Sequence, residues 1–231
     1  MVYLLDKNTI NFPDPRDGDP DGLFAVGGDL SVQRLALAYS YGIFPWYAFR
    51  AEDTAPELID PETGLPYIQW WCPMQRFVIF PDEVHVSHSM RQMIRKLDKG
   101  ELRVTINQAF EQVIDRCGSL REDVEGAWLG PDIKAAYIEL ERQQYALSIE
   151  VWRGEELVGG LYGVALGRGF FGESMFSLIP SASKLALVML SKFCQMVGIT
   201  IIDCQFETPH LRSMGGRFIT YDEYLKLIQP E

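Results

Sequence analysis

The sequence has few cysteines and histidines and no long apolar run. Its 231 residues include four cysteines without a Cys-x-x-Cys pair, and three histidines at no metal-ligand spacing. No stretch approaches the ~20 apolar residues of a membrane helix. Asp6 and Lys7 interrupt the amino terminus, so no apolar core of a secretory signal is expected. We therefore expect a reduced, cytoplasmic protein with no bound metal and no membrane partner.

The chain also lacks an excess of positive charge. It carries 21 basic and 32 acidic side chains, which gives a formal net charge of −11. A protein of this charge is not attracted as a whole to nucleic acid or to anionic membranes. Any contact with nucleic acid therefore requires a local basic patch.

One such patch is predicted on a helix at residues 88–99. Its apolar side chains recur at i, i+3, i+4 and i+7, which is typical of an amphipathic helix; they are Met90, Met93, Ile94 and Leu97. The opposite face carries a line of basic residues, Arg91, Arg95 and Lys99, with Lys96 beside it. Two interpretations stay open: a solvated helix face, or a surface that binds a phosphate backbone.

The order of predicted elements indicates an α+β fold. Ser31 is expected to cap a helix at 32–41, and the acidic, proline-containing stretch 51–66 reads as a loop. Further helices are expected after residue 107, at 132–143 and up to Val197. Strands are predicted at 102–106, 146–152, 157–165, 170–177 and 199–205. We expect a small N-terminal α/β domain at 1–72 and a mixed-sheet domain at 73–231.

Two of the predicted strands each place an acid among apolar residues. In "FFGESMFS" alternation puts Glu173 on one face with Met175 and Ser177, and in "ITIIDCQ" it puts Asp203 on one face with Gln205. Burying a carboxylate without a partner is costly, so each must be solvated, hydrogen-bonded or raised in pKa. Either acid alone could be structural. Together, and beside Gln205, they favour a functional site.

Three other motifs do not fit the chemistry they suggest. "GRGFFG" is followed by aromatic β residues where a dinucleotide-binding loop requires a helix. "GESMF" ends in a Phe that is too bulky for a nucleophile elbow, so Ser174 is expected to be structural. Cys204 with His210 suggests a thiol nucleophile, but strand alternation points Cys204 toward the core.

Several segments, in order, resemble one family of enzymes. They are "GLFAVGGDLSVQRLALAYSYGIFPWY", "WWCPMQRFV", "SIEVWRGEELVGGLYGVALGRGFFGESMFS", "SASKLAL" and "IIDCQ" followed by "HLRSMGG". The sequence is similar in these segments to the bacterial leucyl/phenylalanyl-tRNA–protein transferases. The resemblance implies a small domain packed on an acetyltransferase-like (GNAT-type) domain. It also implies transfer of Leu, Phe or Met from aminoacyl-tRNA to the N-terminal Arg or Lys of a protein, which marks that protein for N-end-rule degradation.

The resemblance also assigns site residues and implies that no metal or coenzyme is used. Positions around the reacting ester correspond to Trp46, Glu173, Asp203 and Gln205, with Asp203 and Gln205 nearest the chemistry. Positions near the apolar amino-acid pocket correspond to Trp128, Leu161, Met175 and Ser177. The basic line on the helix at 88–99 is then the expected tRNA contact.

Two other functions are considered. An acyl-coenzyme A N-acyltransferase on the same fold requires a glycine loop that leads into a helix, and "SLIPSASKLAL" does not provide one. A non-catalytic RNA-binding module would need the basic line and the aromatic residues, but not the two acids. Transfer from charged tRNA to an Arg-initiated peptide would separate these functions.

Overall fold

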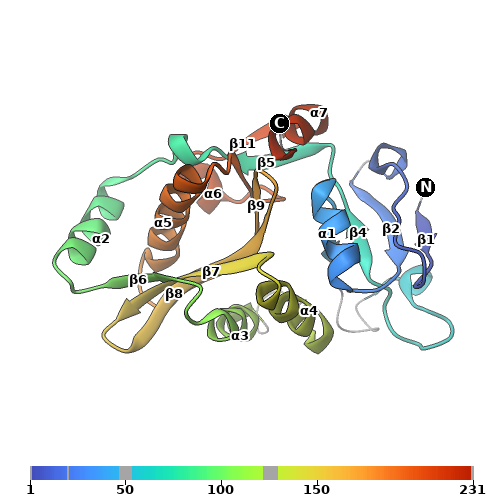
Figure 1. Cartoon of the computed structure of the whole chain (residues 1–231), viewed down its shortest axis with the longest axis horizontal. Helices are drawn as coiled ribbons and strands as arrows, with labels where there is room; N and C mark the ends of the chain where they lie inside the picture. Colours follow the sequence, from blue (N-terminus) through green and yellow to red (C-terminus); the bar gives the residue numbers. More distant parts are fainter. Residues whose placement is uncertain (1, 20, 47–53, 122–129, 230–231) are drawn as a thin grey trace. The chain divides into compact units, whose positions relative to one another are not determined.

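The computed structural model describes residues 2–19, 21–46, 54–121 and 130–229 (Figure 1). They form two compact units, which are described separately: one comprises residues 1–74 with 118–140, and the other comprises 75–117 with 141–231. The domain boundary expected at residue 72 stays a prediction. No helix among these residues is long and apolar enough to span a membrane.

The first unit contains a four-stranded sheet in the order β1-β2-β4-β3. Its strands are β1 (Tyr3–Leu5), β2 (Leu23–Gly27), β3 (Phe44–Trp46) and β4 (Gln69–Trp71). β1 is parallel to β2 and the other neighbours are antiparallel. Helix α1 (Val32–Ser40) confirms the expected helix at 32–41, and the Ser31 side chain caps it by accepting the Arg34 backbone N–H at 3.3 Å.

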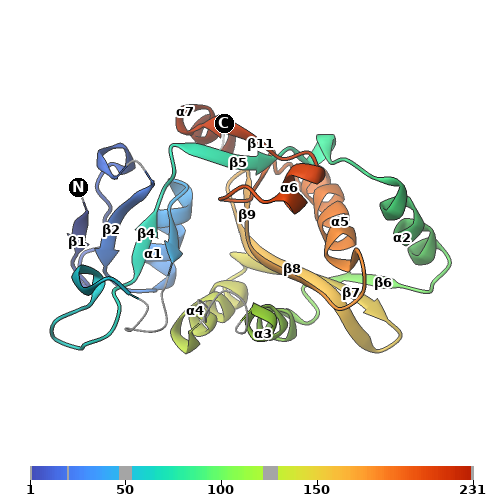
Figure 2. The ribbon, with the colours of Figure 1, turned by 180° about the vertical axis from the view of Figure 1, so that it is seen from behind.

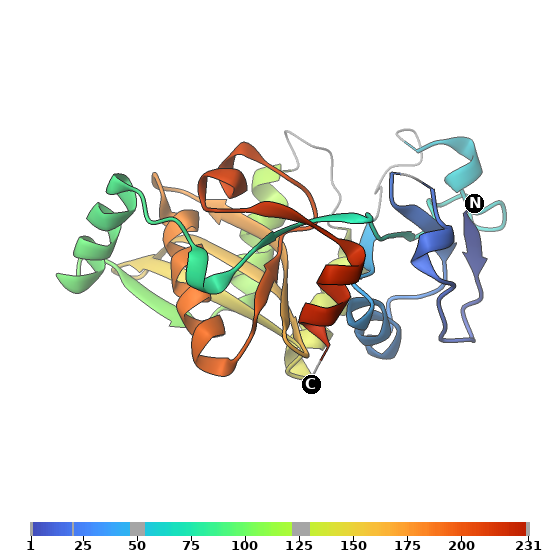
Figure 3. The ribbon, with the colours of Figure 1, turned by 90° about the horizontal axis from the view of Figure 1, so that it is seen from above.

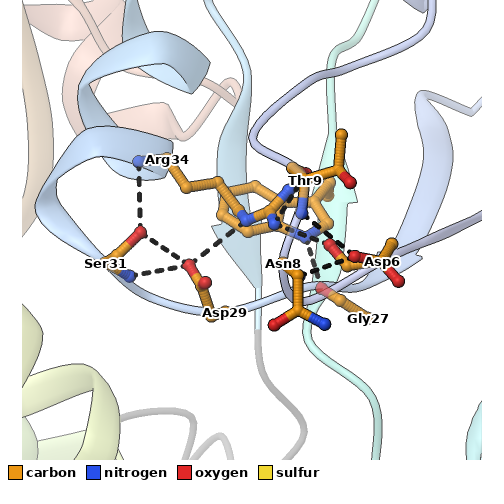
Figure 4. Close-up of polar contacts among 8 residues, drawn as sticks. Asp6, Asn8, Thr9, Gly27, Asp29, Ser31 and Arg34 are labelled. Atoms are coloured by element: carbon orange, nitrogen blue, oxygen red, sulfur yellow. Dashed lines mark hydrogen bonds and ion pairs between the residues drawn. The ribbon is translucent and has the colours of Figure 1, made fainter.

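A buried arginine ties the start of the chain to α1 (Figure 4). Arg34 donates from Nη2 to the carbonyl oxygens of Asp6 (2.7 Å) and Thr9 (3.1 Å), and its Nε pairs with Asp29 Oδ1 at 3.2 Å. These contacts provide partners for Nη2 and Nε of a guanidinium that has no solvent exposure. Helix α4 (Pro131–Arg142) confirms the expected helix at 132–143, and its Tyr137 hydroxyl lies 2.6 Å from that of Tyr39.

The second unit contains a seven-stranded mixed sheet in the order β11-β5-β10-β9-β8-β7-β6. β10 is parallel to β9, and every other neighbouring pair in this sheet is antiparallel. The strands are β5 (Gln75–Ile79), β6 (Arg103–Ile106), β7 (Ala146–Arg153), β8 (Glu156–Leu166), β9 (Gly169–Ser177), β10 (Ile201–Asp203) and β11 (Arg217–Thr220). The predicted α+β class is confirmed. Figure 2 shows β7, β8 and β9 as consecutive hairpins.

Two adjacent glycines show how helices cover both faces of this sheet. A Cβ at Gly159 would lie 2.5 Å from Ala182 of α5 (Ala182–Val197), whereas one at Gly160 would lie 3.3 Å from Val113 of α3 (Phe110–Arg121). Because neighbouring strand residues point to opposite faces, α5 and α3 pack on opposite sides (Figure 1). The close approach of α5 leaves no space for a side chain at residue 159.

The remaining helices of the second unit lie around this core. Helix α2 (His88–Asp98) contacts α5 through its apolar face, on which Met90 and Met93 are buried, so the predicted amphipathic helix is confirmed. α6 (Pro209–Ser213) is short. α7 (Tyr221–Ile228) packs against β5 and β11 (Figure 3). Because β5 pairs with β10, this packing brings α7 side chains close to the short strand β10.

Candidate active site

The parallel pairing of β9 and β10 brings Glu173 and Gln205 together. Asp203, the last residue of β10, lies opposite Phe171, which is two positions before Glu173 in β9. The Gln205 side chain donates from Nε2 to Glu173 Oε1 at 3.2 Å. Both side chains are half-buried. A carboxylate in the middle of β9 and an amide just beyond the end of β10 therefore meet.

Glu173 lies at a β-bulge. Tyr162 and Gly163 of β8 pair with Ser174 and Gly172 of β9, which leaves Glu173 as an extra residue between them. A bulge interrupts strict alternation and redirects the side chain of the extra residue. This explains how a carboxylate within an otherwise apolar strand reaches the end of β10.

The predicted strand at 199–205 is longer than the observed one. β10 ends at Asp203, and Gln205 has a φ of +63°, in the left-handed region that a residue with a side chain seldom adopts. The Asp203 side chain stabilises this turn, because its Oδ1 accepts the Gln205 backbone N–H at 2.8 Å. Strand alternation was therefore the wrong reason to group Asp203 with Gln205.

Asp203 is enclosed by other side chains. It is 1% exposed, and its Oδ2 accepts the Tyr224 hydroxyl at 2.7 Å and lies 3.1 Å from Arg76 Nε. Arg76 and Tyr224 are also buried. Burial raises the pKa of the Tyr224 phenol well above its usual value, and the Asp203 charge adds to this rise. The phenol therefore stays protonated and serves as a hydrogen-bond donor.

Arg76 and Tyr224 are partners that the sequence did not reveal. They come from β5 and α7, 148 positions apart in the chain. The one available signal was the acid itself, since a buried carboxylate requires a cation or several donors. Nothing in the spacing of either residue identifies it as that partner.

Cys204 does not have the surroundings of a nucleophile. Its side chain packs at the margin of the hydrophobic core, and Sγ lies 3.8 Å from the Ile202 carbonyl oxygen. Burial, with a smaller effect of the Asp203 charge, raises the pKa of the thiol well above its usual value. The thiolate that would attack an ester is thus disfavoured.

The predicted pocket residues of the second unit lie close to Glu173 in sequence and in the sheet. Leu161 is buried and pairs with Met175, which is half-buried against the core that contains α5. The Ser177 hydroxyl donates to the Ile179 carbonyl and accepts the Ser183 backbone N–H, both at 3.0 Å. A hollow of about 340 Å³ opens here; it is lined by Ser177, Leu178, Ile179, Pro180, Ser181, Ser183, Lys184 and His210.

The other predicted contacts lie elsewhere. Trp46 is 42% exposed in the first unit, with its ring centroid 5.9 Å from that of Trp71. Trp128 lies outside the described residues. The four basic residues at 88–99 are all exposed; they are Arg91, Arg95, Lys96 and Lys99. Within the part of the chain that the structure describes, no cluster of His, Cys, Asp or Glu could hold a metal ion.

The fold is of the mixed α+β class, and the comparisons with known sequences identify the chain as an enzyme of the transferase class. The sequence model described as leucyl/phenylalanyl-tRNA protein transferase matches residues 78–229, and the one for the N-terminal domain of the same proteins matches residues 28–74. The chain therefore belongs to the leucyl/phenylalanyl-tRNA–protein transferase family, and the resemblance noted in the sequence is confirmed.

Relatives that bear this name are similar over nearly their full length. The leucyl/phenylalanyl-tRNA–protein transferase of Anaeromyxobacter sp. (strain Fw109-5) is 45% identical over 225 residues, which cover 97% of this chain and 88% of the relative. That of Pseudomonas fluorescens (strain Pf0-1) is 44% identical over 230 residues, covering 97% and 94%. The alignment with a solved GCN5-related N-acetyltransferase from Kribbella flavida covers 62% of this chain and 53% of the acetyltransferase chain. The identity is 10% and the TM-score is 0.37, and a similarity this low supports no conclusion.

Proposed function

We propose that this enzyme transfers Leu, Phe or Met from aminoacyl-tRNA to the N-terminal Arg or Lys of proteins and so marks them for N-end-rule degradation. Family membership supports the aminoacyl-tRNA donor and the protein acceptor. The observation that carries the proposal is the contact between Glu173 and Gln205, which gathers a carboxylate and an amide at one partly exposed place. The reaction would take place in the cytoplasm, where charged tRNA is made.

The reaction is the aminolysis of an ester. The acceptor amine attacks the carbonyl carbon of the aminoacyl group, a peptide bond forms, and the ribose hydroxyl of the tRNA leaves. An α-amine with a pKa of about 7.7–8.0 is already partly neutral near pH 7, so only modest proton transfer is required. Positioning alone can contribute roughly 7–11 kcal/mol to such a reaction. The main task of the site is therefore to hold two substrates in register.

The site residues divide this task between them. The Glu173 carboxylate provides negative potential that attracts an ammonium group of the donor or the acceptor. Gln205 donates from its Nε2 to Glu173. The side-chain carbonyl oxygen of Gln205 can then accept a hydrogen bond from the attacking amine. Because Asp203 is 1% exposed and already engaged, it acts through Gln205 and not by direct proton transfer.

Apolar and basic residues provide substrate binding. Met175, Leu161 and Ser177 would lie beside the donor side chain, and a flexible Met suits linear and aromatic donors alike. The roles that the family resemblance assigns to Trp46 and Trp128 stay predictions. The basic line at residues 88–99 would contact tRNA phosphates; it consists of Arg91, Arg95 and Lys99, with Lys96 beside it. This line compensates locally for the net charge of −11.

The deciding experiment is transfer of radiolabelled Leu from charged tRNA to a peptide that begins with Arg. The same peptide with Lys first is a second substrate, and one with Asp first is the control. We expect label on the Arg and Lys peptides alone, and competition by unlabelled Phe-tRNA and Met-tRNA. Label on the Asp peptide would overturn the acceptor assignment. Binding of tRNA without transfer would favour the RNA-binding module, and acylation by an acyl-coenzyme A would favour the other transferase.

A further inference from the structure

Resting on the function proposed above, we infer that Arg76 and Tyr224 are positioning residues for aminoacyl transfer. They hold Asp203, and Asp203 in turn holds Gln205 in its contact with Glu173. The chain of contacts therefore extends from two buried residues that touch no substrate to the partly exposed pair where the reaction is proposed to occur.

The two oxygens of Asp203 have separate partners. Oδ2 accepts the Tyr224 hydroxyl at 2.7 Å and lies 3.1 Å from Arg76 Nε. Oδ1 accepts the Gln205 backbone N–H at 2.8 Å. A carboxylate held on one oxygen cannot rotate freely, so its second oxygen stays in a fixed direction. Arg76 and Tyr224 thus determine where the Gln205 backbone is held.

The Gln205 backbone requires such support. Its φ of +63° is strained for a residue with a side chain, and such conformations persist where the surrounding structure enforces them. A backbone hydrogen bond from the Phe206 N–H to the Cys204 carbonyl oxygen, at 2.7 Å, spans Gln205, and the hydrogen bond to Asp203 Oδ1 holds the N–H of Gln205 itself. If that bond loosens, the backbone can relax toward negative φ, and Nε2 moves away from its position 3.2 Å from Glu173 Oε1.

The composition of the cluster supports a role beyond packing. A buried ion pair is often no more stabilising than well-packed apolar residues of the same volume, so stability alone does not account for three buried polar side chains. The guanidinium also lies 4.8 Å from the centre of the Tyr224 ring. This packing fixes Arg76 and Tyr224 relative to each other, as precise positioning requires.

Tyr224→Phe is the variant that tests the inference, because it removes one hydroxyl and keeps the ring. Arg76→Gln is less suitable, since it leaves the Asp203 charge buried without its cation and endangers folding. In Tyr224→Phe we expect kcat for transfer to fall roughly 10- to 100-fold, as for a small displacement of a reacting group, with KM for Leu-tRNA nearly unchanged. Tyr221→Phe, on the same helix and with its ring stacked on Tyr224, is the matched control and should keep its kcat.

Combining Tyr224→Phe with Gln205→Ala separates positioning from a merely structural effect. If Tyr224 acts through Gln205, the double variant should be no slower than Gln205→Ala alone, because the side chain that Tyr224 positions is already absent. Independent, multiplying losses, or a normal kcat in Tyr224→Phe, would overturn the inference. Should Gln205→Ala itself transfer normally, the proposed site is wrong; a slow Gln205→Ala with a normal Tyr224→Phe refutes the positioning role alone.

Discussion

In Asp203→Asn the side chain keeps its shape but loses its charge and one of its two acceptor oxygens. Three groups converge on the native carboxylate: the Tyr224 hydroxyl, Arg76 Nε and the Gln205 backbone N–H. An amide offers one acceptor oxygen. Its NH2 group, which is itself a donor, would stand where the carboxylate has its second oxygen and would face another donor. The variant therefore weakens at least one side of the network whichever way the amide is turned.

The expected magnitudes follow from this geometry. Removing one partner of a buried ion pair typically costs about 3–5 kcal/mol of stability. For a protein of this size that corresponds to a fall in Tm of roughly 6–20 °C, at about 2–4 °C per kcal/mol. Transfer should slow by about 10²-fold or more, as expected when reacting groups are misplaced. Binding of charged tRNA should change far less, because phosphate contacts supply most of it.

The assay is single-turnover transfer from Leu-tRNA to an Arg-initiated peptide, measured well below the Tm of the variant, with tRNA affinity measured in parallel. Asp29→Asn is a useful control because it also removes a carboxylate that pairs with a buried arginine, Arg34, in the first unit. We expect the control to lose stability without a comparable loss of rate. Normal transfer by Asp203→Asn would refute the reasoning, and an equal loss in Asp29→Asn would show that stability alone limits the rate.

Three further changes test the other residues. Converting Arg91, Arg95 and Lys99 to Gln should weaken tRNA binding without altering the Tm. The slope of log binding constant against log salt concentration should fall by about 0.7–0.9 per lost phosphate contact, and an unchanged slope would mean that these residues form a solvated helix face. Met175→Glu should abolish transfer of both Leu and Phe while tRNA affinity is kept, and wild-type transfer would make Met175 a core residue only. Cys204→Ala should keep its transfer rate and lose some thermal stability, because the pKa of this thiol is raised by burial; an inactive variant would indicate a thioester intermediate.

Periodicity in the sequence predicted the elements whose pattern is local. The apolar spacing in α2, the strand at 170–177 and the helix ending at Val197 are all observed. Each depends on side chains within one element, so a window of the sequence contains the required information. The strand at 199–205 was predicted too long because alternation was carried past its apolar residues as far as Gln205. The Asp203 side chain, and not a propensity, sets the turn that follows.

The candidate site shows where such reasoning stops. Glu173 and Gln205 were both predicted as site residues, and that role stays a prediction. Their contact depends on a bulge in β9 and on parallel pairing with β10, neither of which has a signature in "FFGESMFS" or "IIDCQ". The partners of Asp203 lie on β5 and α7 and meet it only in the folded sheet. A buried acid in a sequence predicts that a partner exists, and the identity of that partner is decided by topology. For this enzyme that distinction matters, because the residues that topology adds are the ones that fix the geometry of the pair proposed to carry the reaction.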